Sequence, residues 1–181
     1  MAQREYELTT EELAARVGEL EVGDRVWLTG TVYTARDAAH KRIFALLDEG
    51  REPPFPIRGS IVYYAGPTPA KHGMAVGSCG PTTSARMDKF APRLLDMGQL
   101  AQIGKGDRSP EVVEAIRRNG AVYLCAVGGA GALIARSITA AEEIAFPELG
   151  CESVKRMTVE RLPLIVGIDS RGHSIFERTE P

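Results

Sequence analysis

Apolar residues recur at helical spacing in several segments, and capping residues mark where these helices begin and end. A segment that opens at Arg36-Asp37 places its apolar side chains on one face, at Ala39, Ile43, Leu46 and Leu47. Ser109-Pro110 and Asn119-Gly120 delimit a second helix, because serine caps the first turn, proline suits its first position and glycine ends the last. Further helices are expected at Thr9–Val17, Thr82–Leu95, Ala132–Ile138 and Glu152–Met157.

Strands are expected where apolar residues alternate or run continuously between turn signals. The segment Arg25–Tyr33 alternates, with one face formed by Val26, Leu28 and Val32. Shorter strands are expected at Ile61–Tyr64, Leu100–Ile103 and Ala121–Val127. Near the C-terminus, Leu164–Ile168 and Ser174–Phe176 are expected to pair as a hairpin around the turn at Asp169–Gly172.

The order of these elements favours a single α/β domain with a mixed sheet. Strands and helices do not follow the strict βαβ alternation of a doubly wound fold. No repeat, low-complexity tract or linker divides the 181 residues, and a domain of this length can bury a full core. Residues 1–20 are expected to form a short N-terminal helical extension of that domain.

The composition argues against several classes of partner. The net charge is −2 with acids and bases interspersed, which gives no basic footprint for nucleic acid or an anionic membrane. No apolar run reaches the roughly 18 residues that a membrane span needs, and Met1–Glu7 is too polar for a signal peptide. Cys79, Cys125 and Cys151 are odd in number and far apart, which argues against a disulfide scaffold and for a cytoplasmic protein.

The segment Gly77–Asp88 combines a Gly-Pro break, three hydroxyls and an arginine. It is expected to open the helix at Thr82, and the first turn of a helix presents unpaired N–H groups to anions. On such a helix Arg86 would lie one turn from Thr82, on the same face. The segment is therefore interpreted as a carboxylate- or phosphate-binding corner. The alternative interpretation is that Gly-Pro-Thr-Thr simply caps a helix.

Two further cations stand where predicted elements meet. Arg36 lies at a strand-to-helix turn, and Lys105 is flanked by glycines that let a ligand approach closely. Together with Arg86 they would supply three positive charges, enough for a small dicarboxylate, because arginine can hold a carboxylate by two parallel hydrogen bonds. His40 can act as an acid or base or pack as a structural histidine, and Asp37 can do the same chemistry or serve as a helix-start acid.

Two other patterns fall short of a cofactor site. Three thiolates can hold an iron–sulfur cluster, but these cysteines lack Cys-x-x-Cys spacing and Cys125 lies in an apolar strand. Gly129-Ala130-Gly131 is similar to a dinucleotide-binding loop, but Ile134 stands where that fingerprint needs a third glycine. Neither a cluster nor a dinucleotide is therefore expected to be held by this chain.

Several motifs in order resemble the β subunit of a two-subunit class I fumarate hydratase, which is equivalent to the C-terminal domain of the single-chain enzymes. The motifs that carry the resemblance are Leu28–Tyr33, Arg36–Arg42, Tyr64–Pro69, Gly80–Asp88, Ile103–Gly106 and Ala145–Gly150. They cover most of the chain apart from its two ends. A series of motifs in family order is far more specific than any one of them.

The resemblance implies a swivelling β/β/α domain that closes over an active site shared with an α subunit. In that family the α subunit holds a 4Fe–4S cluster through three cysteines. This chain would then be active only with that partner, and would assemble through a homodimeric contact or as an (αβ)2 complex. The family commonly has alanine at the position of Cys79, and the resemblance assigns this thiol no role.

The resemblance also implies roles for single residues. Three of them correspond to residues that bind the substrate carboxylates: Arg36, Arg86 and Lys105. Thr82 corresponds to a residue implicated in proton transfer. Three others lie in matched motifs and are expected to support the site without touching the substrate: Asp37, His40 and Thr83.

The implied reaction is the interconversion of fumarate and (S)-malate, a step of the tricarboxylic acid cycle. One alternative is an L(+)-tartrate dehydratase β subunit, which shares the Gly-Pro-Thr-Thr-Ser motif, although Ala126–Ala130 and Phe146–Gly150 look more like a fumarase. The other alternative is a non-catalytic module that binds small anions with the same basic residues.

Overall fold

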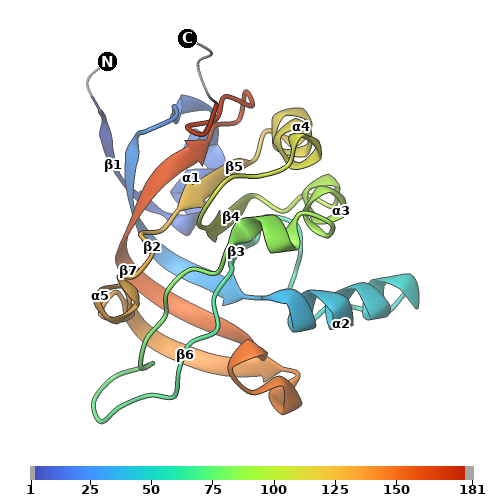
Figure 1. Ribbon diagram of the computed structural model, residues 1–181, viewed down its shortest axis with the longest axis vertical. Helices are drawn as coiled ribbons and strands as arrows, with labels where there is room; N and C mark the ends of the chain where they lie inside the picture. The colour runs from blue at the N-terminus through green and yellow to red at the C-terminus, as the bar shows by residue number, and fades with distance from the viewer. Residues whose placement is uncertain (1–2, 178–181) are drawn as a thin grey trace.

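The computed structural model describes residues 3–177 and contains a β-sheet that closes on itself (Figure 1). The strands are β1 (Glu5–Thr9), β2 (Arg25–Thr34), β3 (Ile61–Tyr63), β4 (Ala101–Gly104), β5 (Val122–Cys125), β6 (Ile138–Ala145) and β7 (Val154–Ile168). The α-helices are α1 (Thr10–Arg16), α2 (Asp37–Asp48), α3 (Ala91–Asp96), α4 (Pro110–Asn119) and α5 (Gly131–Ala135). Short 3₁₀ helices are η1 (Val17–Glu19), η2 (Ser84–Met87) and η3 (Pro147–Glu152).

Strand β7 closes the sheet into a barrel. The strand order is β1-β2-β3-β4-β5-β7-β6, and β2 also pairs with β7. Strands β2, β3, β4 and β5 are parallel neighbours, whereas β7 runs antiparallel to both β2 and β5. Because β7 bonds to the first and last strands of that parallel run, the five strands form a closed ring. The arrangement confirms the predicted α/β fold with a mixed sheet.

Apolar side chains fill the barrel and a second layer between the sheet and the helices. Val26 and Leu28 of β2 are fully buried in the barrel core, as the alternating pattern predicts. In β3, Ile61 and Tyr63 belong to that core, while Val62 lies in a second cluster with residues of α2 and α3. Strands buried on both faces read as continuous apolar runs. Figure 1 places α2, α3 and α4 on the same outer side of the barrel.

The capping signals locate the ends of several helices correctly. The Ser109 hydroxyl accepts a hydrogen bond from the Val112 amide, and Gly120 ends α4 in the left-handed conformation, with φ of 61°. Thr9 and Glu12 form a capping box at the start of α1. Within residues 3–177, no helix combines the length and the apolar character that crossing a membrane requires.

The C-terminal part of the chain differs most from the prediction. Glu152–Met157 was expected to be helical, but Val154 begins the 15-residue strand β7. The helix expected at Ala132–Ile138 is the shorter α5, which ends at Ala135. Ile138 instead begins strand β6. Pairing of β7 with β2, β5 and β6 determines its conformation, and such long-range pairing is not visible in a local pattern.

Two smaller predictions are also corrected. The expected hairpin near the C-terminus is present but short: Ile168 and Ser174 form an antiparallel bridge, and the Ile175 amide donates to the Gly167 carbonyl at 2.9 Å. Its first strand, expected at Leu164–Ile168, is the end of the longer strand β7. The N-terminal stretch expected as a helical extension carries α1, but it also contains β1. That strand pairs in parallel with β2 and so belongs to the sheet.

The expected helix Thr82–Leu95 is an extended link followed by the short helices η2 and α3. Pro81 and Thr83 form isolated β-bridges with Ala65 and Lys105. These bridges hold the backbone in an extended form, so no helix begins at Thr82. The predicted anion site at a helix N-terminus is therefore wrong.

A buried ion pair holds this segment onto the loop after β4. Arg108 Nε donates to Asp88 Oδ1 at 2.7 Å, and the Arg108 side chain is 0% exposed. Asp88 also accepts from the Ser109 amide at 2.6 Å, and Arg108 Nη1 donates to Gln102 Oε1 at 2.8 Å. The Arg108 guanidinium lies 4.8 Å from the ring centroid of Tyr123. Removing one partner would leave a buried charge without its counter-ion.

His40 anchors the first turn of α2 in the helical layer. The residue is 1% exposed, its Nδ1 lies 2.8 Å from the Arg36 carbonyl oxygen, and its ring stacks on Phe90. Burial lowers the pKa of His40 to about 4, although the Arg36 carbonyl and Asp37 act in the opposite direction. His40 is therefore neutral in the folded chain at pH 7.

We expect Asp88→Asn to lower the free energy of unfolding by about 3 kcal/mol, because it leaves Arg108 buried without its counter-ion. Asp48→Asn is the matched control, since Asp48 pairs with Arg93 on the surface. That change should have an effect below about 1 kcal/mol. Urea denaturation measures both, and equal losses in the two variants would contradict the anchoring role of Arg108.

The free energy of unfolding should rise with pH from about 4 to 6.5, because in this range the unfolded chain binds a proton at His40 and the folded chain does not. One such proton contributes about 1.4 kcal/mol per pH unit. Urea titrations across this range should show a shallower slope in His40→Asn. The exposed loop residue His72 is the control, and His72→Asn should keep the original slope. An unchanged slope in His40→Asn would show that this histidine is not the group responsible.

Candidate functional site

The carboxyl ends of three adjacent parallel strands bring the candidate residues to one edge of the barrel. Arg36 and Asp37 follow β2, Tyr64 to Gly66 follow β3, and Lys105 follows β4 directly. In open α/β sheets ligands bind outside the carboxyl ends of parallel strands, where the chain is free to vary. Because β2, β3 and β4 run in one direction, a ligand is expected at this edge for the same reason.

The extended link at Thr82 crosses these strand ends. The Thr82 amide donates to the Tyr64 carbonyl at 2.7 Å, and the Ser84 amide donates to the Lys105 carbonyl at 2.9 Å. Thr82 therefore lies between the residue that follows β3 and the residue that follows β4. Both amides are used within the fold, so they are not free to bind an anion. The candidate anion-binding groups at this edge are therefore the side chains of Arg36, Arg86 and Lys105.

Gly104 makes this close approach possible. A Cβ atom at that position would lie 1.9 Å from Ser84 Oγ and 3.0 Å from a ring carbon of Tyr64. The Ser84 hydroxyl also accepts a hydrogen bond of 2.8 Å from the Tyr123 hydroxyl. The absence of a side chain at Gly104 thus lets the Thr82 link lie against the end of β4, one residue before Lys105.

Asp37 brings Arg86 to the same edge. Arg86 Nη2 donates to Asp37 Oδ2 at 2.7 Å, and Arg86 Nε donates to Asp37 Oδ1 at 3.3 Å. The Arg86 side chain remains 50% exposed. Its position therefore depends on the ion pair with the first residue of α2, and not on helical spacing from Thr82 as expected. Arg36, the residue before Asp37, is the N-cap of the same helix.

The Lys105 ammonium and the Thr82 hydroxyl make few polar contacts with the rest of the protein. The stem of Lys105 runs beside Gly128, where a Cβ atom would lie 3.4 Å from Lys105 Cδ and 3.9 Å from Nζ. Within residues 3–177, the Lys105 ammonium has no ion pair and the Thr82 hydroxyl makes no hydrogen bond. Both groups are half-buried at the edge and can bind another molecule.

The supporting residues proposed from the sequence occupy different surroundings. His40 is buried beneath Arg36, Asp37 holds Arg86, and Thr83 is exposed. Sequence reasoning missed Glu152, whose carboxylate faces Arg36 Nε at 3.6 Å. The one available signal was the matched motif Ala145–Gly150, which ends two residues before Glu152.

The cysteines do not assemble a metal centre in the described part of the chain. Cys79 is buried, Cys125 is half-buried and Cys151 is exposed. Among residues 3–177, no group of three or more histidine, cysteine, aspartate or glutamate side chains could hold a metal ion. Burial raises the pKa of the Cys79 thiol to about 12, so this thiol stays protonated. These residues do not fit an iron–sulfur cluster.

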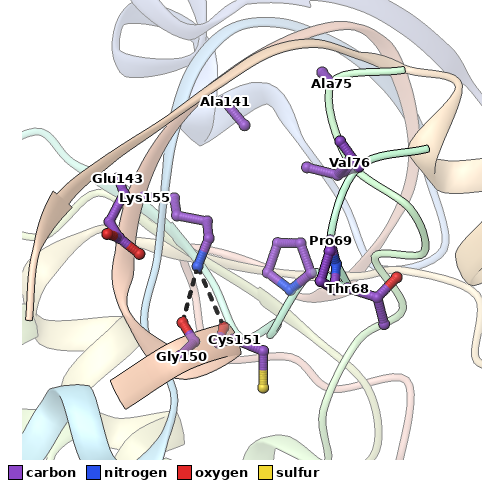
Figure 2. A pocket seen from close by; sticks show the side chains of 11 residues that line it. Thr68, Pro69, Ala75, Val76, Ala141, Glu143, Gly150, Cys151 and Lys155 are labelled. Atoms are coloured by element: carbon purple, nitrogen blue, oxygen red, sulfur yellow. Dashed lines mark hydrogen bonds between the residues drawn. The ribbon is translucent and has the colours of Figure 1, made fainter. Parts of the chain in front are cut away.

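A separate cavity of 380 Å³ lies beside the candidate edge and is lined by other residues (Figure 2). Its walls include Thr68, Ala141, Glu143 and Cys151. Lys155 Nζ reaches toward the carbonyl oxygens of Gly150 and Cys151 at 3.4 Å, and it also contacts Ser153 Oγ at 2.6 Å. The Lys155 ammonium is therefore already hydrogen-bonded to oxygen atoms of this chain.

Comparison with known proteins identifies relatives along nearly the whole chain. The family model described as "Fumarase C-terminus" matches residues 1–179. "Fumarate hydratase class I, anaerobic" of Escherichia coli (strain K12) is 37% identical over 92% of this chain and 31% of its own length. "Fumarate hydratase 2" of Leishmania major is 37% identical over 93% of this chain and 30% of its own length.

A third relative has a size similar to this chain. The "Putative L(+)-tartrate dehydratase subunit beta" of Methanocaldococcus jannaschii is 41% identical over 89% of this chain and 86% of its own length. The chain thus spans about a third of the length of the two fumarate hydratases and most of the length of this subunit. With a family model covering residues 1–179, this chain belongs to the Fumarase C-terminus family.

Proposed function

We propose that this chain is the β subunit of a hydro-lyase that interconverts fumarate and (S)-malate together with a second chain. The observation that carries the proposal is that Arg36, Arg86, Lys105 and Thr82 belong to segments that follow or cross the carboxyl ends of β2, β3 and β4. The relatives named as fumarate hydratases support the reaction class.

The three cations are assigned to the substrate carboxylates. A four-carbon dicarboxylate carries two negative charges, and the fork of an arginine matches a carboxylate with two parallel hydrogen bonds. Arg86 already holds the Asp37 carboxylate in this way and is half exposed, so its remaining surface can approach a substrate. Lys105, whose backbone pairs with Thr83, supplies a point charge next to the link that carries Thr82. We expect these groups to bind and orient the substrate.

The same cations favour the proton transfer that dehydration of malate requires. Removing the proton next to a carboxylate makes that carboxylate gain negative charge in the transition state, and fixed cations stabilise this charge. Thr82 is proposed to carry the proton through its hydroxyl oxygen. A threonine hydroxyl is a poor base at neutral pH, so it needs an activating carboxylate, which we assign to the partner chain.

The 4Fe–4S cluster and the rest of the site are assigned to an α subunit. The tartrate dehydratase relative is named as a β subunit, and the alignment covers 86% of it, which supports a separate partner. The fumarate hydratase relatives are about three times longer than the matched region, which supports the same division within one polypeptide. We propose that the two chains assemble as an (αβ)2 complex or through a homodimeric contact of this chain.

A second candidate function is the β subunit of an L(+)-tartrate dehydratase. It is favoured by the Methanocaldococcus jannaschii relative, which is 41% identical to this chain and similar in length. Tartrate is also a small dicarboxylate with a hydroxyl beside each carboxylate, so the same three cations could bind it.

Anaerobic purification of the chain with its native partner, followed by assays with three substrates, tests both functions. We expect the complex to dehydrate (S)-malate and hydrate fumarate, and the isolated chain to do neither, because the other half of the site is absent. Turnover of tartrate alone would favour the second function. Binding of dicarboxylates without turnover of any of them would point to a non-catalytic module and contradict both.

We expect Thr82→Val to lower kcat of the complex by about 100-fold with a smaller change in KM, because it removes the hydroxyl and keeps the shape. Thr82→Ser should retain most of the activity, since it keeps that oxygen. Thr31→Val is the matched control for an exposed threonine elsewhere on the chain. Steady-state kinetics with (S)-malate measures all three, and a Thr82→Val enzyme with normal kcat would remove the proposed role.

A further inference from the structure

The Arg36 guanidinium faces the carboxylate of Glu152. Glu152 Oε1 lies 3.6 Å from Arg36 Nε, and the two side chains are 28% and 23% exposed. Both of these atoms are shielded from solvent, and neither has a hydrogen-bond partner within residues 3–177. A buried donor and a buried acceptor that face each other at this distance need only a small movement to bond.

We propose that Glu152 is the positioning residue for Arg36. It contacts the Nε side of the guanidinium and leaves the two terminal nitrogens for a substrate carboxylate. The inference rests on the proposed function, in which Arg36 binds substrate, and it adds a residue that no motif at the candidate edge contains. Glu152 acts through Arg36 and does not touch the substrate.

The turn that carries Glu152 is fixed to α2 at its first residues. Arg42 of α2 pairs with Glu148 at 2.8 Å, and its guanidinium lies over the ring of Phe146 at 5.1 Å. Phe146 has a φ of 56°, in the left-handed region that non-glycine residues rarely adopt. Such a conformation persists where the surrounding contacts hold it, which indicates that η3 is held in one position against α2.

The last residues of the turn are fixed to β7. The Ser153 amide donates to the Gly150 carbonyl at 3.0 Å, and Lys155 Nζ reaches the carbonyl oxygens of Gly150 and Cys151 (Figure 2). Gly150 has a φ of 61° and a ψ of −124°, a kink that this residue type allows. Glu152 therefore extends from a turn that is held at both ends.

The Arg36 side chain also packs closely against Gly66. A Cβ atom on Gly66 would lie 3.0 Å from Arg36 Nη1 and 3.2 Å from the Cys151 carbonyl oxygen. The arginine is thus packed between the loop after β3 and the turn that carries Glu152. In this narrow space the carboxylate of Glu152 is the group that can select one orientation of the guanidinium by charge.

The test combines a spectroscopic readout on the isolated chain with kinetics of the complex. Glu152→Ala removes the carboxylate, and Glu152→Gln keeps an oxygen that can still accept from Arg36 Nε. Glu142→Ala is the matched control, because Glu142 is exposed and pairs with Arg156 on the surface of the sheet. The Arg36 Nε–H resonance is observed by ¹H–¹⁵N correlation and assigned by its loss in Arg36→Lys.

We expect Glu152→Ala to shift the Arg36 resonance and to raise KM for (S)-malate about tenfold with a smaller change in kcat. Glu152→Gln should recover most of the affinity, and Glu142→Ala should change neither measurement. Urea denaturation of each variant confirms that it is folded. An unmoved Arg36 resonance in Glu152→Ala would overturn the inference.

The two proposals fail in different ways. If Arg36→Gln raises KM strongly but Glu152→Ala leaves kinetics unchanged, Arg36 binds substrate without help from Glu152 and the inference is wrong. If the resonance shifts in Glu152→Ala while neither Arg36→Gln nor Glu152→Ala alters turnover, Glu152 does orient Arg36. In that case the role of Arg36 in the proposed function is wrong.

Discussion

The buried ion pair between Asp88 and Arg108 is the constraint on which the candidate site depends. It ties the segment after Thr82 to the loop after β4, and the rings of Tyr64 and Tyr123 lie beside the Arg108 guanidinium. A charge this deeply buried tolerates few alternative arrangements, because each would leave it without a partner. The link at Thr82 is extended and contains no regular helix, so this pair supplies the rigidity that a helix would otherwise provide.

Carboxylates of the chain balance the cations gathered at the edge. Arg36 and Arg86 come from different elements, and their mutual repulsion would spread them apart in the absence of counter-charges. Asp37 pairs with Arg86, and Glu152 faces Arg36. Each arginine is thus held by one carboxylate from the protein and keeps part of its surface for another. Lys105 has no such partner among the described residues.

Local signals predicted those parts of the fold that local interactions determine. The caps at Ser109 and Gly120 delimited α4, and the alternation of Val26 and Leu28 identified β2. The conformation of β7 and of the Thr82 link could not be predicted in this way, because each depends on pairing with residues far along the chain. For the site, residue types and family motifs pointed to Arg36, Arg86 and Lys105. The contact of Glu152 with Arg36 required the folded turn.

The position of β7 after β2 and β5 in the sequence has a consequence for biosynthesis. Arg25 of β2 pairs with Ile165 of β7, and Leu124 of β5 pairs with Val166. A growing polypeptide on the ribosome therefore exposes the open edges of β2 and β5 until β7 has been made. Unpaired strand edges are templates for association with other chains. Barrel closure must wait for β7 to emerge, which prolongs the time during which these edges can associate with other chains.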